Sequence, residues 1–304
     1  MTVHLALVGP TASGKSALAL HVARTLGDIE IVSVDSMQVY RGLDIGTAKP
    51  TPAERHAVPH HLVDVSEPDE AWTVVRFQEA ARAAVVDIEA RGRRALLIGG
   101  TGLYVQAVVD DLRFPGEDPD LRAELEAWTA QPGGVAAAYG ELERTDPTAA
   151  ARIDSHNARR IVRALEVIRL TGSPFSSFGP GVNAFGPTAF PVRIAGVWLP
   201  RAVLAERIDT RVSMMREAGL VQEVTGLRAR LSRTARQAIG YKELLDALEG
   251  DGDMDAAFDT VGRRTRSFAR RQRMWFRRDP RITWLGAAHN PCALLSALLA
   301  MWSR

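Results

Sequence analysis

Residues 9–16 read Gly-Pro-Thr-Ala-Ser-Gly-Lys-Ser, and this stretch decides the fold. The apolar run Val3–Val8 precedes it, and Ser16–Leu26 continues with the spacing of a helix. Glycines between a strand and a helix let backbone N–H groups turn inward around a phosphate, and the helix N-terminus adds a positive dipole end. Lys15 would supply a point charge, and the Ser16 hydroxyl would ligate Mg²⁺. This context favours a phosphate-binding P-loop over a chance match in an ordinary turn.

Short apolar segments alternate with helical segments along most of the chain, which is typical of a parallel sheet covered by helices on both faces. The other strands are expected at Ile29–Val34, His61–Val65, Ala95–Ile98, Val192–Leu199 and Ile282–Leu285. The main helices after the first are expected at Thr73–Ala90, Arg201–Ala218, Leu244–Leu248 and Ala256–Trp275. We therefore expect an α/β fold with a P-loop NTPase-like parallel sheet.

Polar loops follow three of these strands, at Gly9–Ser16, Asp35–Gln38 and Gly99–Gly102. Ligand sites of parallel sheets lie beyond the carboxyl ends of the strands. We expect the three loops to converge on one site.

The pattern changes at Phe114, after which Pro and Gly residues interrupt it. Helices are expected at Leu121–Trp128, Gly134–Glu143 and Ala158–Leu170, followed by a long loop at Gly172–Pro191. We interpret residues 114–191 as a helical insertion into one α/β core, formed by residues 1–113 and 192–304.

Composition excludes several classes of protein. The 304 residues, 46% of them hydrophobic, suffice for a large core. No apolar run approaches the roughly 20 residues that span a bilayer, and the N-terminus lacks the basic region of a signal peptide. The single cysteine, Cys292, excludes internal disulfides and a multi-cysteine zinc site. We expect a cytoplasmic protein without a membrane partner and, because nothing suggests an obligate interface, a monomer.

Positive charge is concentrated near the C-terminus, although the net charge is only +2. Residues 263–281 contain nine arginines and one acid. Phe268, Trp275 and Phe276 recur among them at helical spacing, so they are expected to pack inward while the arginines cover the exposed face. A solvated helix face and contact with a polyanion such as a nucleic acid both fit this pattern.

The residues alone leave the ligand of the P-loop open. Nucleotide is the default, but hydrolases and kinases usually carry an aspartate after a later strand, whereas Leu96–Ile98 runs into Gly99. Asp35 fits a general base and an ordinary strand-end turn equally well. Lysine occurs only at Lys15, Lys49 and Lys242, and a chain rich in arginine can retain lysine where a compact ammonium is needed.

Three histidines, His56, His60 and His61, have a spacing similar to that of metal ligands. Pro59 interrupts any helix there, and no second cluster supplies thiols or acids at suitable spacing. We interpret this segment as a turn before a strand.

Taken together, these segments resemble the bacterial tRNA dimethylallyltransferases, also called tRNA isopentenyltransferases. The resemblance covers nearly the whole chain in the family's order and is carried by GPTASGKS at 9–16, VDSMQVYRGLDIGTAKP at 34–50, PHHLVD at 59–64, GGTGLY at 99–104, RALEVIRLTG at 163–172, QAIGYKE at 237–243 and RTRSFARRQRMWFRR at 264–278. The second of these is highly specific, whereas the glycine loops alone are not.

The resemblance implies transfer of a dimethylallyl group from dimethylallyl diphosphate to N6 of adenine 37, beside the tRNA anticodon. The P-loop and Mg²⁺ would then hold the departing pyrophosphate. Catalysis is expected of Asp35, as the base, with Thr101 and Arg211. Diphosphate binding is expected of Gly9, Thr11, Ala12, Ser13, Gly14, Lys15, Ser16 and Arg207.

The same resemblance implies contact with the anticodon stem-loop of tRNA, whose target base must leave its stack. Gln38 would read the adenine edge. The residues expected at this contact are Asp35, Ser36, Met37, Gln38, Thr101, Arg122, Arg159, Arg160, Arg163, Gln237, Ala238, Ile239, Gly240, Tyr241 and Lys242.

Three alternatives compete with this reading. They are an isopentenyltransferase acting on free adenine nucleotides, a small-molecule P-loop kinase, and a nucleic-acid-binding protein with a vestigial P-loop. The basic C-terminal third and the insertion at residues 114–191 favour a macromolecular acceptor.

Overall fold

The computed structural model describes residues 2–110, 112–178, 182, 184–250 and 252–303. The chain divides into two compact units. Met1–Asp110 and Phe185–Arg304 form the first, here called the core, and Asp111–Ala184 form the second, the insertion.

The boundaries of the insertion differ from the expected ones because residues 185–191 belong to the core. The backbone N–H of Ala189 donates to the carbonyl of Val109 at 2.8 Å, and the backbone N–H of His4 donates to the carbonyl of Pro191 at 2.9 Å. Phe190 packs on the main apolar cluster of the core. The insertion is therefore shorter than the predicted 114–191 at its C-terminal end.

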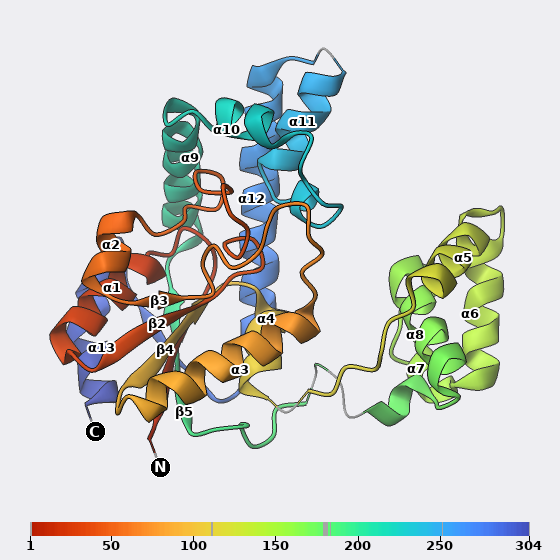
Figure 1. Ribbon diagram of the computed structural model, residues 1–304, viewed down its shortest axis with the longest axis horizontal. Helices are drawn as coiled ribbons and strands as arrows, with labels where there is room; N and C mark the ends of the chain where they lie inside the picture. Colours follow the sequence, from red (N-terminus) through yellow and green to blue (C-terminus); the bar gives the residue numbers. More distant parts are fainter. Residues whose placement is uncertain (1, 111, 179–181, 183, 251, 304) are drawn as a thin grey trace. The chain divides into compact units, whose positions relative to one another are not determined.

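A six-stranded, fully parallel sheet lies at the centre of the core (Figure 1). Its strands are β1 His4–Val8, β2 Ile29–Val34, β3 His60–His61, β4 Arg94–Gly99, β5 Val192–Trp198 and β6 Ile282–Gly286. They lie side by side in the order β3-β2-β4-β1-β5-β6. The predicted parallel α/β fold is confirmed.

Helices cover both faces of this sheet (Figure 1). Those of the core are α1 Lys15–Leu26, α2 Pro52–Ala57, α3 Val74–Ala90, α4 Gly102–Val109, α9 Arg201–Glu217, α10 Leu220–Leu227, α11 Tyr241–Glu249, α12 Met254–Phe276 and α13 Leu295–Trp302. The sequence reading did not anticipate α2, α4, α10 or α13. Among the described residues, no helix has the length and apolar character needed to cross a bilayer.

Alternate residues of the central strands β1, β2, β4 and β5 face two different apolar clusters, as the period of a strand requires. In β1, Ala6 and Val8 pack with side chains of α3, α4 and α12, whereas Leu5 and Leu7 pack with those of α1 and α13. Both faces are fully buried, so these strands read as continuous apolar runs in the sequence.

The third strand is much shorter than predicted. Only His60–His61 pairs with β2, and the expected continuation to Val65 is wrong. Leu62 and Asp64 have φ values of 62° and 57°, which are incompatible with a strand. Asp64 is held in this turn by ion pairs to Lys49 and Arg55, both at 2.6 Å.

The helices α9 and α12 lie against one another beyond the sheet (Figure 1). They run antiparallel, because Arg216 near the end of α9 pairs with Asp255 at the start of α12, and Asp209 pairs with Arg266 further along. Leu204, at the start of α9, shares a small apolar cluster with Ala269. The pair places one face of each helix near the polar loops of the sheet.

The insertion has its own apolar centre. Its helices are α5 Pro119–Ala130, α6 Gly134–Thr145, α7 Pro147–Ala150 and α8 Ala158–Thr171, with a short 3-10 turn η1 at Phe175–Phe178. Leu125, Leu142, Ile161 and Leu165 are buried in this centre. The three longer helices match the predicted ones within a few residues.

Candidate active site

The phosphate loop joins β1 to α1 and adopts a conformation that its glycines make possible. Gly9 and Gly14 have φ values of 147° and 83°, a range in which side chains are strained. There is also no room for a side chain at Gly14, since a Cβ there would lie 2.3 Å from Pro291. Ala12, with φ at 60°, carries part of the strain itself.

Lys15 is buried at the centre of this loop, where its Nζ donates to the carbonyl of Pro10 at 2.6 Å. Its pKa is lowered from 10.5 to about 7, mainly because burial disfavours the ammonium and also because Arg211 is close. The carboxylate of Asp35 acts in the opposite direction. A bound anion would favour the ammonium form of Lys15 and raise its pKa again.

Two arginines of α9, one turn apart, reach the same loop. Arg207 donates through Nε to the carbonyl of Ala12 at 2.8 Å, and Arg211 donates through Nη1 to Oγ1 of Thr11 at 3.2 Å. Burial lowers the pKa of Arg211, while Asp35 opposes the shift. These contacts join positions almost 200 residues apart in the chain.

Ser13 adds a polar group that has no protein partner. Its side chain is fully buried, and its Oγ forms no hydrogen bond with any residue that the structure describes. Buried hydroxyls are rarely left unsatisfied unless a ligand or water completes them. This hydroxyl, beside Lys15, fits a ligand oxygen.

Asp35 follows β2, and its carboxylate is oriented by its own turn. Oδ1 accepts hydrogen bonds from the backbone N–H groups of Met37 at 2.8 Å and Gln38 at 3.4 Å. The charge of this carboxylate influences both Lys15 and Arg211. The structure thus brings Asp35, the phosphate loop and α9 together at one end of the sheet.

The glycine loop after β4 is tied to the phosphate loop by Gln272 of α12. The side-chain Oε1 of Gln272 accepts from the N–H of Thr11 at 2.8 Å, and its Nε2 donates to the carbonyl of Gly100 at 2.9 Å. A Cβ on Gly100 would lie 2.3 Å from that Nε2, and one on Gly102 would lie 2.2 Å from the Trp275 ring. Both glycines make room for α12, and Thr101 lies between them as the N-cap residue of α4.

Sequence reasoning missed Gln272. A polar residue at a position that shares the inner face of the helix with Phe276 and Ala269 was the available signal, since buried amides are retained where they are hydrogen-bonded.

Gln38 is engaged within the protein. Its Oε1 accepts from Ser33 Oγ at 2.8 Å, and its Nε2 donates to the carbonyls of Thr47 at 3.1 Å and Ala48 at 3.3 Å. Of its two neighbours in the predicted contact, Met37 packs partly buried against the core, and Ser36 is half-buried. The loop at residues 35–48 is therefore internally bonded in this structure.

A carboxylate of α10 holds the next part of that loop. Glu223 accepts from the N–H groups of Ile45 at 2.8 Å and Gly46 at 3.2 Å, and it also accepts from the hydroxyl of Tyr241. Tyr241 is fully buried, and a Cβ on Gly46 would lie 2.4 Å from its ring. No motif or spacing around Glu223 indicates this role.

Residues 237–242, predicted to contact RNA, form the turn η3 at Ala235–Gln237 and the start of α11. Ala238 and Gly240 are buried, Ile239 is half-buried and Gln237 is exposed. Lys242 pairs with Asp246 at 2.9 Å on the surface.

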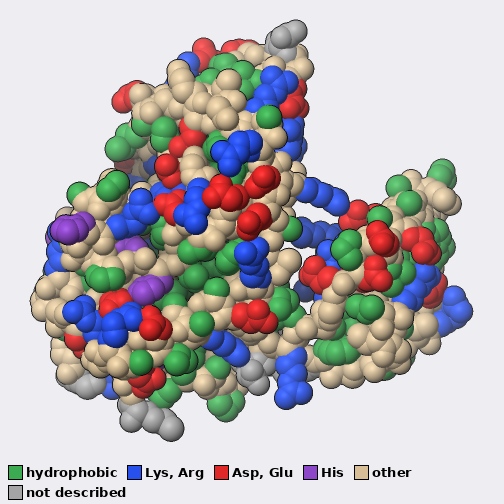
Figure 2. All heavy atoms as spheres, viewed as in Figure 1, with side chains coloured by type: hydrophobic (Ala, Val, Ile, Leu, Met, Phe, Trp, Pro, Cys, Tyr) green, Lys and Arg blue, Asp and Glu red, His purple; other side chains and the backbone are tan. Residues whose placement is uncertain are grey.

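In the insertion, two of the four predicted arginines bind one buried carboxylate. Glu166 has no exposed surface; it accepts from Arg122 at 3.0 Å and from Arg163 at 2.9 Å. Arg159 and Arg160 are exposed. Figure 2 shows acidic as well as basic side chains on the visible face of the insertion, in keeping with such pairing.

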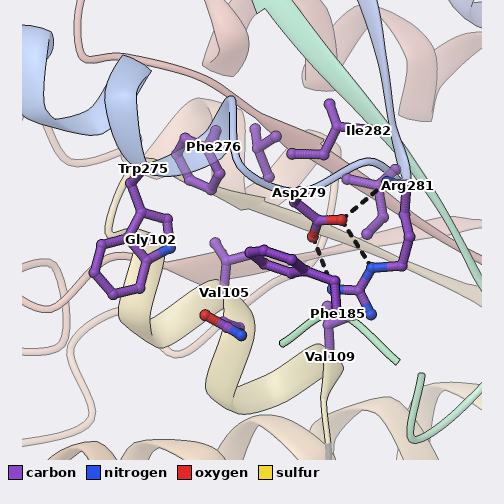
Figure 3. A pocket seen from close by; sticks show the side chains of 12 residues that line it. Gly102, Val105, Val109, Phe185, Trp275, Phe276, Asp279, Arg281 and Ile282 are labelled. Atoms are coloured by element: carbon purple, nitrogen blue, oxygen red, sulfur yellow. Dashed lines mark hydrogen bonds and ion pairs between the residues drawn. The ribbon is translucent and has the colours of Figure 1, made fainter. Parts of the chain in front are cut away.

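A small cavity lies between α4 and α12, beside the end of β1 (Figure 3). Phe185 and Trp275 line it, and Asp279 with Arg281 closes one side through an ion pair of 2.7 Å. Its volume of about 10 Å³ holds no more than a single water. It is too small for a five-carbon prenyl group.

The described residues contain no group of three or more His, Cys, Asp or Glu side chains suited to a metal ion. His60 bonds through Nδ1 to the carbonyl of Val58, and His61 bonds through Nε2 to Glu30, each at 2.7 Å. Ser16 is exposed in the first turn of α1. The Ser16 hydroxyl beside the phosphate loop is the protein group that would hold an Mg²⁺ ion.

A phosphate loop at the carboxyl edge of a parallel sheet, with two arginines and a carboxylate beside it, defines the class of P-loop proteins. Comparison with known proteins narrows this class. The IPP transferase family model matches residues 38–279, and the isopentenyl transferase model matches residues 1–66. The chain belongs to the IPP transferase family.

Individual relatives agree with this assignment. A tRNA dimethylallyltransferase of Kineococcus radiotolerans is 52% identical over 93% of this chain and 90% of its own length. A tRNA dimethylallyltransferase of Bifidobacterium longum is 47% identical over 94% of this chain and 87% of its own length.

Solved structures give the same result. The full-length tRNA isopentenylpyrophosphate transferase of Bacillus halodurans has a TM-score of 0.71 and 40% identity, covering 100% of this chain and 96% of that one. A eukaryotic dimethylallyltransferase acting on tRNA has a TM-score of 0.77 and 26% identity. The match covers 95% of this chain and 74% of that one.

Proposed function

We propose that this protein transfers a dimethylallyl group from dimethylallyl diphosphate to N6 of adenine 37 of tRNA and releases pyrophosphate. In the reaction a C–O bond to the diphosphate breaks, a C–N bond to the adenine forms, and N6 loses a proton. The observation that carries the proposal is the meeting of Asp35 with Lys15 and Arg211. Asp35 then acts on the attacking N6 amine, and the phosphate loop acts on the departing diphosphate, on opposite sides of the reacting carbon.

The diphosphate is held by the loop and by α9. Lys15, Arg207 and Arg211 balance its charge, and the buried Ser13 hydroxyl donates to one of its oxygens. These groups stabilise the negative charge that grows on the leaving group as the C–O bond breaks. The hydroxyl of Thr101, near Gly100, donates toward the bridging oxygen.

Mg²⁺, held by Ser16 and the diphosphate, would supply further charge stabilisation when bound. The protein's own part at this point is to present the Ser16 hydroxyl on the first turn of α1.

Asp35 accepts the proton from N6. The two backbone N–H groups that bond its Oδ1 fix the carboxylate, and Oδ2 accepts no hydrogen bond from a described residue. The exocyclic amine is a weak nucleophile because its lone pair is delocalised into the ring, so a positioned base lowers the barrier. Gln38 reads the adenine edge through the second lone pair of its amide oxygen or by exchanging its bonds to Thr47 and Ala48.

A macromolecular acceptor is favoured by the exposed arginines of α12 and of the insertion. Arg263 and Arg270 on α12, and Arg159 and Arg160 on α8, are exposed and have no carboxylate partner among the described residues. Such groups suit backbone phosphates of RNA.

The test is a transfer assay with labelled dimethylallyl diphosphate. Label should move to unmodified tRNA and not to AMP, and ATP should yield no phosphorylated product. Efficient labelling of AMP would identify an enzyme of free nucleotides, and phosphate transfer from ATP without prenyl transfer would identify a kinase. Binding of tRNA without any turnover would leave only a nucleic-acid-binding role.

A further inference from the structure

Arg273 of α12 is a buried cation that has no carboxylate partner among the described residues. Only 9% of its surface is exposed, and its guanidinium carbon lies 3.6 Å from the centroid of the Trp198 ring. No side-chain hydrogen bond or ion pair connects it to any residue that the structure describes. By contrast, Arg281 nearby in the sequence pairs with Asp110 and Asp279. An unpaired buried charge is costly, so its position calls for an anion.

Two further arginines lie close to Arg273. Arg277 follows one helical turn later, and Arg201 is the first residue of α9, which runs antiparallel to α12. Both are exposed. Burial is the main cause of the lowered pKa of Arg273, and the charges of Arg201 and Arg277 lower it further, with no carboxylate acting against them. Within the described part of the chain, these three like charges therefore gather without a carboxylate to balance them.

The N-terminus of α9 adds to this positive region. The helix has 17 residues, its N-cap is Pro200, which offers no side-chain cap, and its first turn contains no acidic residue. Unpaired N–H groups and the dipole at such an end favour an anion.

The Trp198 ring beneath Arg273 is itself packed against a second tryptophan. Trp198 meets Trp284 edge to face, with ring centroids 6.0 Å apart. Trp284 lies over Gly196, where a Cβ would come within 2.6 Å of its ring. Because Gly196 leaves that space, Trp284 packs over it and against Trp198. The Trp198 ring in turn supports the guanidinium of Arg273.

We propose that Arg201, Arg273 and Arg277, with the first turn of α9, form a second phosphate-binding site that is separate from the phosphate loop. Arg207 of the loop site lies six residues further along α9, so the two sites share that helix. The ligand is a phosphate group, supplied by the backbone of RNA or by free pyrophosphate. The first source rests on the proposed function, whereas the second does not.

The test uses two variants and one control in the full-length chain. Arg273→Met keeps a long side chain against Trp198 but removes the charge, and Arg201→Gln removes an exposed charge with little risk to folding. Arg24→Gln, on the exposed side of α1, is the matched control for the loss of one positive charge. If Arg273→Met does not fold, Arg201→Gln decides alone.

Two quantities are measured for each variant. One is the number of pyrophosphate molecules bound per chain, by titration calorimetry. The other is the salt dependence of binding to an unmodified anticodon stem-loop RNA. An RNA phosphate in the site predicts that the slope of log K against log salt falls by about 0.7–0.9 in both variants and stays unchanged in the control.

Free pyrophosphate in the site predicts two molecules bound to the unmodified protein and one to each variant, with an unchanged RNA slope. Unchanged slope and unchanged stoichiometry in both variants would overturn the proposal and leave Arg273 as a packing residue over Trp198. Absence of prenyl transfer by the unmodified protein would overturn the proposed function alone, because neither binding measurement depends on turnover.

Discussion

We expect the affinity of the phosphate loop for a diphosphate to depend on pH because of Lys15. In the ligand-free protein its pKa is lowered from 10.5 to about 7, first by burial and then by the charge of Arg211, with Asp35 opposing. The lysine is therefore mostly neutral above pH 7. A bound diphosphate favours the ammonium and raises the pKa again. Binding above pH 7 consequently takes up a proton, and the affinity falls as the pH rises.

The size of the effect follows from linkage. With a free pKa of about 7, the charged fraction of Lys15 falls from about one quarter at pH 7.5 to about 3% at pH 8.5, so affinity falls about eightfold over that unit. At pH 8 each binding event takes up about 0.9 proton. Titration calorimetry of dimethylallyl diphosphate in buffers with different ionisation enthalpies counts this proton directly.

Lys15→Met is the control, because it removes the titrating amine and keeps an unbranched side chain of similar length. It should bind with no more than a small proton uptake, which measures the titration of the ligand itself. The reasoning would be refuted if the unmodified protein took up no proton at pH 8, or if Lys15→Met took up as much. Either result would mean that Lys15 is not the group that takes up a proton when the ligand binds.

Four further predictions concern other groups. Asp35→Ala should lower kcat by about 10²–10⁴-fold with tRNA affinity largely kept; near-normal single turnover would remove Asp35 as the base. Gln272→Leu should lower kcat about tenfold while KM for tRNA changes little, because only the link between Thr11 and Gly100 is lost; an equal loss in tRNA affinity would argue against a positioning role. Glu166→Gln should lower the free energy of unfolding by about 2–4 kcal/mol in denaturant titration, and an unchanged midpoint would contradict it. Arg263→Gln combined with Arg270→Gln should reduce the salt slope of tRNA binding by about 1.5, whereas an unchanged slope would make this helix face merely solvated.

The phosphate loop could be predicted from the sequence because its constraints are local. Strand, glycines, lysine and helix follow one another within 26 residues, and each position has a backbone reason for its residue type. The buried strands were equally readable, since both faces of the sheet are covered and the runs are apolar throughout. The predicted length of the third strand was wrong because Leu62 and Asp64 turn the chain with positive φ, which the hydrophobic periodicity does not reveal.

The ties between loops could not be predicted, because they join distant parts of the chain. Gln272 lies 261 residues from Thr11 and 172 from Gly100, yet one amide holds both. Glu223 similarly lies 178 residues from Ile45. Arginines were easy to find but hard to interpret, since a guanidinium that pairs with a buried carboxylate, as Arg122 does with Glu166, looks the same in sequence as one that faces solvent.

At two of the three lysine positions, the structure gives a physical reason for lysine in place of arginine. Lys49 is 3% exposed at its side chain, and its Nζ donates to the carbonyl of Tyr40 at 2.7 Å and to Asp44 and Asp64 at 2.5 and 2.6 Å. Three acceptors around one nitrogen match the three donors of an ammonium, whereas a planar guanidinium would need more space.

The same argument applies to Lys15 in the phosphate loop, where a compact amine must bond to the carbonyl of Pro10 and still reach a phosphate. It does not apply to Lys242, which forms a surface pair with Asp246 that an arginine could replace. If geometry is what retains lysine, Lys49→Arg should destabilise the protein in thermal unfolding, and Lys242→Arg should leave its stability within about 0.5 kcal/mol. Equal stability of the two variants would mean that the choice of lysine at Lys49 has no geometric cause.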